Sequence, residues 1–195
     1  MENLKNAESL VVRQKKEWGE ILTGFEARNR YAVYDPSGQE VYLAAEEGSL
    51  FMRLVLKALR PFSLHILSTD GRPVMKLEKP FRFYFHEMSV FTPEGRRLGT
   101  IKREFSLLER KFSVSDAQGG EVCAICAPLL HPWTFKISSG GAETGEILKN
   151  WSGMLKEAFT DSDNFSVSFP AAAGPDHKAL LLAALFLIDM VYFEK

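Results

Sequence analysis

The chain has 195 residues and a formal net charge of −1, with 46 % apolar and 25 % charged residues. This composition is that of an ordinary globular protein, and the length suits a single domain over residues 1–195 with a full core. The balanced charge excludes a protein-wide basic surface, so we expect no nucleic-acid partner. The first residues contain no apolar run, and we therefore expect no signal peptide and a cytoplasmic protein.

The first segment with a helical pattern runs from Ser9 to Phe25. Its apolar residues, from Val11 onward, fall on one side of a helix, and lysines and glutamates fall elsewhere. Ser9 is a suitable N-cap, and Gly24 lies where a helix would end. The pattern predicts an N-terminal amphipathic helix.

Four turns rich in Asp, Pro and Gly follow, and their last glycines lie 33, 24 and 24 residues apart. The turns are Asp35–Gly38, Asp70–Gly71, Pro93–Gly95 and Asp116–Gly119. Segments in which apolar and polar residues alternate predict strands at Tyr31–Tyr34, Val41–Leu43, Phe62–Ile66, Phe81–His86 and Phe165–Phe169. The regular spacing indicates a repeated strand–turn–strand unit, and hence an antiparallel meander or barrel.

The C-terminal part predicts two helices. Trp151–Phe159 is short, whereas Ala179–Phe193 is apolar on every side apart from Asp189. A bilayer span needs about 20 apolar residues, so this run of fifteen is short for a single-pass anchor. A helix that is apolar all round is normally surrounded by other elements. We therefore predict a mainly β fold, a closed antiparallel barrel around a hydrophobic C-terminal helix.

Asp189 is the one charge in that helix. A buried carboxylate requires a hydrogen-bond or ion-pair partner, so we interpret Asp189 as a structural tie between helix and barrel. A lipid-headgroup or ion site is the alternative. The four histidines are scattered, and no nucleophile–base pair or Gly-rich phosphate loop stands out, so we predict no catalytic residues and no covalent chemistry.

Several segments, in this order and spacing, resemble the phospholipid scramblase family, whose domain has the tubby-like (LURP-one-related) fold. They include Ile21–Glu26, Gly38–Tyr42, Arg60–Leu64, Leu77–Phe81, Glu157–Phe165 and Phe186–Asp189. The resemblance implies a twelve-stranded barrel around a hydrophobic C-terminal helix. It also implies ATP-independent, bidirectional movement of phospholipids at membranes, dependent on calcium. The alternative is a soluble tubby-like module that binds lipid headgroups or proteins without transport; the sequence does not identify which proteins it would bind.

Asp161 and Asp163 align with the calcium loop that the resemblance implies, which makes calcium the expected cofactor. Calcium takes six to eight oxygen ligands. Here Phe165 and Ala172 occupy two of the ligand positions, so we expect weak binding at most. The alternative is an acidic turn after the Trp151–Phe159 helix.

Two groups of residues are candidates for contact with a phospholipid membrane surface, which would make the protein peripherally membrane-associated. The first is the basic cluster Arg96, Arg97, Lys102 and Arg103, which suits anionic headgroups or else forms a solvated hairpin. The second is Phe83, Tyr84 and Phe85, which lie where relatives carry an acylated cysteine-rich segment. These aromatic residues suit interfacial insertion, but their alternation favours a strand with its Phe side chains in the core.

Cys123 and Cys126 have the spacing of a C-x-x-C motif. The segment reads as a strand, in which residues three apart point to opposite faces. We therefore interpret both as packing residues rather than as a redox pair or a zinc site.

Overall fold

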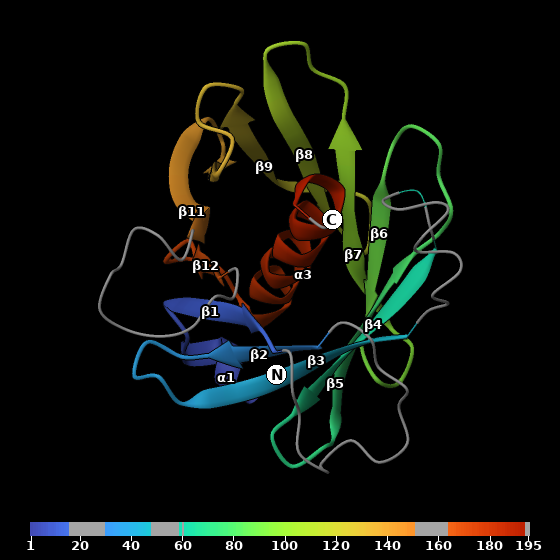
Figure 1. Cartoon of the computed structure of the whole chain (residues 1–195), viewed down its shortest axis with the longest axis vertical. Coiled ribbons are helices and arrows are strands. Elements are labelled where there is room, and N and C mark those ends of the chain that lie inside the picture. Colours follow the sequence, from blue (N-terminus) through green and yellow to red (C-terminus); the bar gives the residue numbers. More distant parts are fainter. Residues whose placement is uncertain (16–29, 48–58, 60, 151–163, 194–195) are drawn as a thin grey trace.

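The computed structural model describes residues 1–15, 30–47, 59, 61–150 and 164–193. Their twelve strands are all antiparallel, and each pairs with its neighbours in chain order. Pairing of β1 with β12 closes the sheet into a barrel (Figure 1), which confirms the predicted architecture. The strands are β1 Ser9–Gln14, β2 Arg30–Tyr34, β3 Glu40–Glu47, β4 Phe62–Ser68, β5 Pro73–Lys79, β6 Glu87–Phe91, β7 Arg97–Glu104, β8 Glu109–Asp116, β9 Glu121–Pro128, β10 Thr134–Ser139, β11 Ala142–Asn150 and β12 Asn164–Ser168. The helices are α1 Glu2–Asn6 and α3 Pro175–Tyr192.

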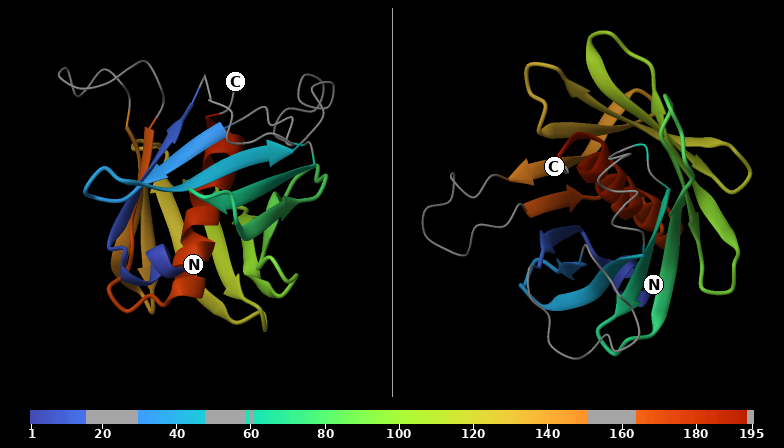
Figure 2. Two further views of the ribbon diagram at one scale, coloured as in Figure 1. Left: turned by 90° about the horizontal axis from the view of Figure 1, so that it is seen from below. Right: turned by 45° about the vertical axis from the view of Figure 1, so that its right-hand side comes forward.

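Helix α3 occupies the interior of the barrel (Figures 1 and 2). Residues Ala179 to Ile188 are each at most 3 % exposed, because strands surround the helix and every side of it is apolar. Inward side chains such as Ile101, Phe112 and Phe135 belong to the same core cluster as the helix. The prediction of an enclosed helix is confirmed. Among the described helices, none combines the length and the apolar character needed to cross a bilayer.

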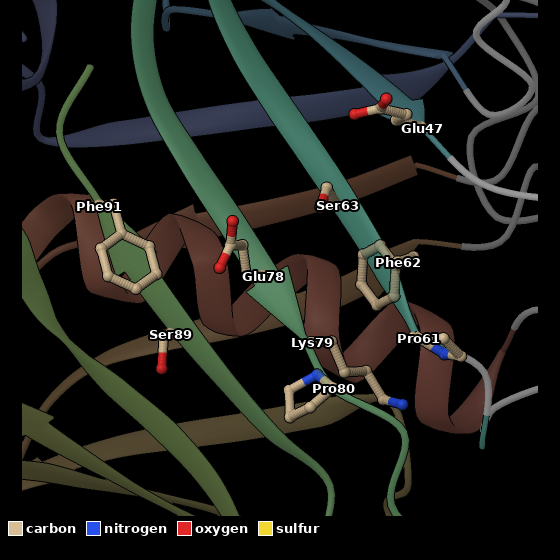
Figure 3. Close-up of a pocket in the computed structure, with 9 residues that line it drawn as sticks. All are labelled: Glu47, Pro61, Phe62, Ser63, Glu78, Lys79, Pro80, Ser89 and Phe91. Atoms are coloured by element: carbon tan, nitrogen blue, oxygen red, sulfur yellow. The ribbon is translucent and has the colours of Figure 1, made fainter. Parts of the chain in front are cut away.

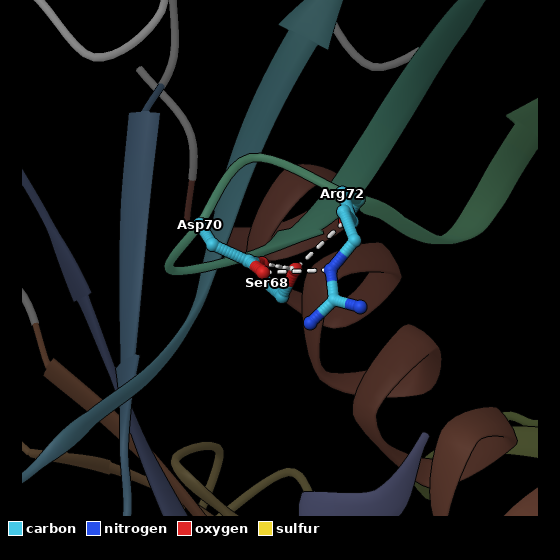
Figure 4. A network of polar contacts seen from close by, with 3 residues as sticks. All are labelled: Ser68, Asp70 and Arg72. Carbon is cyan, nitrogen blue, oxygen red and sulfur yellow. Dashed lines mark hydrogen bonds and ion pairs between the residues drawn. The ribbon is translucent and has the colours of Figure 1, made fainter.

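The four predicted turns are hairpins with one common geometry. In each, a glycine with φ between 82° and 86° donates its N–H to the carbonyl three residues earlier, and the strand register shifts by one residue beside the turn. Only glycine adopts this φ without strain. In the β4–β5 turn, Ser68 donates to one oxygen of Asp70 and Arg72 Nε donates to the other at 2.6 Å (Figure 4). Local side-chain chemistry of this kind explains why the sequence predicted these turns.

The two ends of the barrel differ. Successive connections in an antiparallel meander lie alternately at one end and the other, so each end carries its own set of connections. We call one end the turn end: it carries the tight turns from β2–β3 to β10–β11 and the start of α3. There, Arg96 pairs with Asp176 at 3.2 Å, and Lys178 donates to the carbonyls of Lys5 and Ala7. We call the opposite end the loop end: it carries the longer connections, including β5–β6, β7–β8 and β9–β10, and the C-terminal end of α3.

The prediction of a helix over Ser9–Phe25 was wrong for Ser9–Gln14, which is strand β1, and the N-terminal helix is instead Glu2–Asn6. The strand forms because β1 pairs with β12 on one side and β2 on the other, and these distant partners outweigh a local helical pattern. The rest of the predicted helix, from residue 16, and the Trp151–Phe159 helix lie outside the described residues.

The prediction of a core strand at Phe81–His86 was also wrong. Residues 80–86 form the β5–β6 loop, and Phe83 and Tyr84 are 68 % and 81 % exposed. Pro80 lacks the N–H that a continued ladder would need, so the pairing of β5 with β6 reaches only from Lys76 to Glu78.

Candidate functional site

The barrel interior offers no ligand site in the described part of the chain, because α3 fills it. One hollow is an open groove of about 560 Å³ on the outer surface of β4, β5 and β6 (Figure 3). Its two carboxylates are already paired: Glu47 lies 3.0 Å from His65, and Glu78 lies 2.7 Å from Lys76. The described residues include no group of three side chains that could hold a metal ion. The groove therefore has no chemistry that marks it as a catalytic centre.

The four predicted basic residues do not form one surface. Arg96 and Arg97 lie at the turn end, where Arg96 is engaged by Asp176 and Arg97 donates to Thr100. Arg103 is six residues along β7 from Arg97, and a strand rises about 3.3 Å per residue, which places it about 20 Å away. Lys102 is exposed and lies 3.7 Å from Glu104. Arg103 and the adjacent Lys102 lie toward the loop end, where Lys102 is opposite Glu87, the first residue of β6.

Large exposed apolar side chains gather at the loop end. In the part of the chain that the structure describes, every such side chain lies in one of three loops. We call this set of side chains the apolar rim. They are Phe81, Phe83, Tyr84 and Phe85 in β5–β6, Phe105, Leu107 and Leu108 in β7–β8, and Leu129, Leu130 and Trp133 in β9–β10. The β7–β8 loop extends beyond its strands at the top of Figure 1. A cluster of exposed apolar residues of this kind normally marks an interaction surface.

Backbone contacts join the three loops. Leu129 N donates to Leu108 O at 3.4 Å, which links β9–β10 to β7–β8. Arg103 N donates to His86 O at 2.8 Å, which links β7 to the β5–β6 loop. The three loops are therefore neighbours at this end of the barrel.

Two arginines lie at the base of the β7–β8 loop and stack on one tyrosine of α3. The guanidinium carbon of Arg110 lies 4.2 Å from the Tyr192 ring centroid, and that of Arg103 lies 5.3 Å from it. Arg110 also donates to the Pro132 carbonyl at 2.9 Å, in the β9–β10 loop. Burial lowers the pKa of Arg110, although Tyr192 offsets part of this effect. No carboxylate of the described residues forms an ion pair with either guanidinium.

The Asp189 carboxylate joins α3 to the barrel wall. It accepts a 3.0 Å hydrogen bond from the Tyr31 hydroxyl on β2, and it lies 3.9 Å from Lys149 Nζ on β11. Lys149 also lies over the rings of Phe165 and Phe193. These contacts are the ones that a structural tie requires.

The predicted calcium ligands Asp161 and Asp163 lie outside the described residues. The adjacent Asn164, at the start of β12, has a buried Oδ1 atom without a hydrogen-bond partner. Calcium accepts side-chain amide oxygens of this type as ligands.

The two cysteines have the arrangement predicted for a strand. Cys123 is buried and Cys126 is half-buried on the opposite face of β9, and both are free thiols. Burial raises the pKa of Cys123 to about 12, so its thiol is not reactive at neutral pH.

Reasoning from the sequence missed Arg110, Tyr192 and the apolar residues of the β7–β8 and β9–β10 loops. One signal was available. Phe105, Leu107 and Leu108 stand between two strand patterns, where a connection is normally polar.

Comparison with known proteins identifies the family. The model of the Scramblase family matches residues 1–195. Mouse and human phospholipid scramblase 1 are 35 % and 33 % identical to the whole chain, which spans 64 % and 65 % of their lengths. Bovine phospholipid scramblase 2 is 32 % identical, and the chain spans 71 % of it.

A solved protein from Arabidopsis thaliana shares the fold. Its TM-score is 0.52 at 15 % identity, over 94 % of this chain and 93 % of that one. The closed barrel around a C-terminal helix is the tubby-like architecture, and the match of the family model extends over every residue. The chain therefore belongs to the phospholipid scramblase family.

Proposed function

We propose that this protein moves phospholipids in both directions between the leaflets of a membrane without ATP, from a peripheral position on the cytoplasmic side. The observation that carries the proposal is the match of the scramblase family over the full length of the chain. The sequence contains no Gly-rich phosphate loop for a nucleotide. Lipid would therefore move down its own concentration gradient.

The filled interior of the barrel constrains the route that a lipid can take between the leaflets. Leu181, Ala184 and Leu187 of α3 are completely buried against the strands, so a lipid would have to displace the helix to pass through the barrel. Interiors are close-packed, and such a displacement would cost many side-chain contacts. We therefore place the lipid route outside the barrel, in bilayer that the protein contacts and perturbs.

Calcium is the proposed cofactor. Asp161 and Asp163 would supply carboxylates and Asn164 Oδ1 a further oxygen. A bound calcium ion adds positive charge that favours contact with lipid phosphates. Three side-chain oxygen donors are few for an ion that takes six to eight, so weak, millimolar-range affinity is expected.

A second candidate is a module that binds phospholipid headgroups and transports nothing. The filled barrel favours it, because no internal path for lipid is present in the described part of the chain. Both candidates require contact with lipid, and they differ only in whether lipid changes leaflet.

Reconstitution of the purified protein in liposomes that contain a fluorescent phospholipid tests the proposal. Addition of dithionite bleaches only the outer leaflet, so loss of more than half of the fluorescence reports movement between leaflets. We expect faster loss with protein, and a further increase with calcium. Bleaching equal to that of protein-free liposomes, with and without calcium, would remove the transport proposal. Binding of the protein to liposomes without bleaching beyond the outer leaflet would support the second candidate.

A further inference from the structure

We propose that the loop end of the barrel is the surface that docks on the membrane, with the apolar rim among the acyl chains and Arg103 and Arg110 at the level of the lipid phosphates. The inference rests on the proposed function for the identity of the partner, a phospholipid bilayer. It specifies which end of the barrel meets that bilayer and which side chains make the contact.

The first support is the uneven distribution of apolar side chains. Leu108 and Leu130 are 82 % and 87 % exposed, whereas no large apolar side chain is exposed among the described residues of the turn end. Exposed Leu, Phe and Trp side chains lose unfavourable contact with water when they enter the acyl-chain region. Trp133 and Tyr84 have the amphipathic rings that are common at the membrane interface.

The second support is the position of the cations. The β7–β8 loop carries Phe105, Leu107 and Leu108 at its tip, and Arg103 and Arg110 flank the tip on the two strands below it. With the tip among acyl chains, both guanidiniums reach the depth of the phosphates. Arginine forms bidentate hydrogen bonds with phosphate, which suits this position.

The third support is that the arginines are held in place. Both stack on Tyr192, whose ring in turn contacts the rings of Phe112 and Phe135 in the core. Glu104, the nearest carboxylate on β7, is occupied by Ser113 and Lys102. The two positive charges are therefore presented by a rigid base rather than by a mobile loop.

This orientation directs the C-terminal end of α3 toward the bilayer and the turn end toward the aqueous phase. Arg96 and Arg97 then lie far from the lipid. The inference thus separates Arg103 from Arg96 and Arg97, which the sequence alone groups together.

Fluorescent labels at the two ends test the orientation. In a Cys126→Ser background, Leu130→Cys places a thiol at the loop end and Ala117→Cys places one at the β8–β9 turn, and the buried Cys123 stays unlabelled. With vesicles of phosphatidylcholine and phosphatidylserine, we expect an environment-sensitive dye to shift to the blue at residue 130 only. Lipids with a quencher on the acyl chain should quench it there and not at residue 117. Equal spectra at both sites, a shift at residue 117 alone, or no binding to vesicles would overturn the inference.

Substitutions at the two ends of the barrel give a second measurement. Leu107→Gln with Leu108→Gln should weaken vesicle binding about ten-fold or more, whereas Ala117→Gln should not change it. Arg103→Gln with Arg110→Gln should weaken binding to vesicles with phosphatidylserine roughly five-fold per arginine, whereas Arg96→Gln with Arg97→Gln should leave it unchanged. An unaltered thermal midpoint identifies variants that remain folded; equal effects of both arginine pairs would contradict the orientation.

The dithionite assay separates the two proposals. If lipid changes leaflet while the dye at residue 130 stays in water, the docking surface is wrong and the proposed function stands. If the dye enters the bilayer while no lipid changes leaflet, the docking surface stands and transport fails.

Discussion

Tyr31 on β2 and Asp189 on α3 are 158 positions apart in the sequence, and the Tyr31 hydroxyl donates a 3.0 Å hydrogen bond to the Asp189 carboxylate. Lys149 on β11 lies 3.9 Å from the other oxygen of the same carboxylate. Because α3 is apolar on every side, hydrophobic burial alone does not select one rotation of the helix about its axis. The polar contacts at Asp189 supply that selection.

Replacement of Tyr31 by Phe tests this role. Tyr31→Phe should lower the free energy of unfolding by about 1–3 kcal/mol, because the partly buried Asp189 carboxylate loses a hydrogen-bond donor. The edge-on contact of the ring with Phe186, at 5.2 Å, remains. Urea denaturation measures the change, and Tyr84→Phe, at an exposed position, serves as the control. Equal stability of the two variants would show that the hydrogen bond does not stabilise the fold.

Gly99 on β7 packs tightly against both the β8 backbone and Leu180 of α3. A Cβ atom at this position would lie 2.1 Å from the Ser115 carbonyl oxygen and 3.0 Å from two Leu180 carbons. We expect Gly99→Ala to destabilise the protein by about 1–3 kcal/mol, the usual cost of overpacking. Calorimetry provides the measurement. Gly174→Ala, where a Cβ would meet nothing within 4 Å, should have a much smaller effect; a normal midpoint for Gly99→Ala would contradict the packing.

His86 should make stability dependent on pH between about 4 and 6.5. Burial, with further contributions from Lys79 and Arg103, lowers its pKa from 6.5 to about 4. The unfolded state therefore binds the proton first, so the stabilisation is fully present above pH 6.5 and decreases as the pH falls toward 4. The pKa difference corresponds to about 3 kcal/mol at most.

Denaturation at pH 7 and pH 5 provides the measurement. His86→Gln should reduce the loss of stability between these values, and the exposed His131→Gln should leave it unchanged. Part of the loss should remain in His86→Gln, because burial also lowers the pKa of His177. An unchanged pH dependence in His86→Gln would exclude His86 as a source.

The calcium loop has its own test. Asp161→Asn with Asp163→Asn should abolish the heat of calcium binding in a calorimetric titration, because both expected carboxylate ligands become neutral. Glu143→Gln, which removes a carboxylate at the turn end, serves as the control, and this variant should bind calcium as the parent protein does. Binding that survives in the Asp161 and Asp163 variant would place calcium elsewhere.

The barrel was predictable from local chemistry. A turn such as Asp116–Gly119 forms through contacts among neighbouring residues: Asp116 Oδ1 accepts from the N–H groups of Gln118 and Gly120, and Gly119 adopts φ 86°. Four such turns at regular spacing predict a meander. The strand at Ser9–Gln14 was not predictable in this way, since its partners β2 and β12 are distant in sequence.

The candidate site was harder to predict from the sequence, for the same reason. Arg103, Arg110 and Tyr192 meet only because the barrel encloses α3, so their juxtaposition has no sequence pattern. The aromatic residues Phe83 to Phe85 were found, but their alternation suggested a buried strand. Pro80 was the decisive signal against that strand, because it interrupts the ladder.

The pairing of β1 with β12 delays completion of the fold during synthesis. Strand β1 leaves the ribosome early, but one of its two edges has no partner until residues 164–168 have been translated, and the inner surface of the sheet has no filling until α3 follows. For most of translation the nascent chain therefore presents open strand edges and apolar surface, the two features that promote aggregation. We expect cotranslational chaperones to matter more for this protein than for one whose early segments complete their own core.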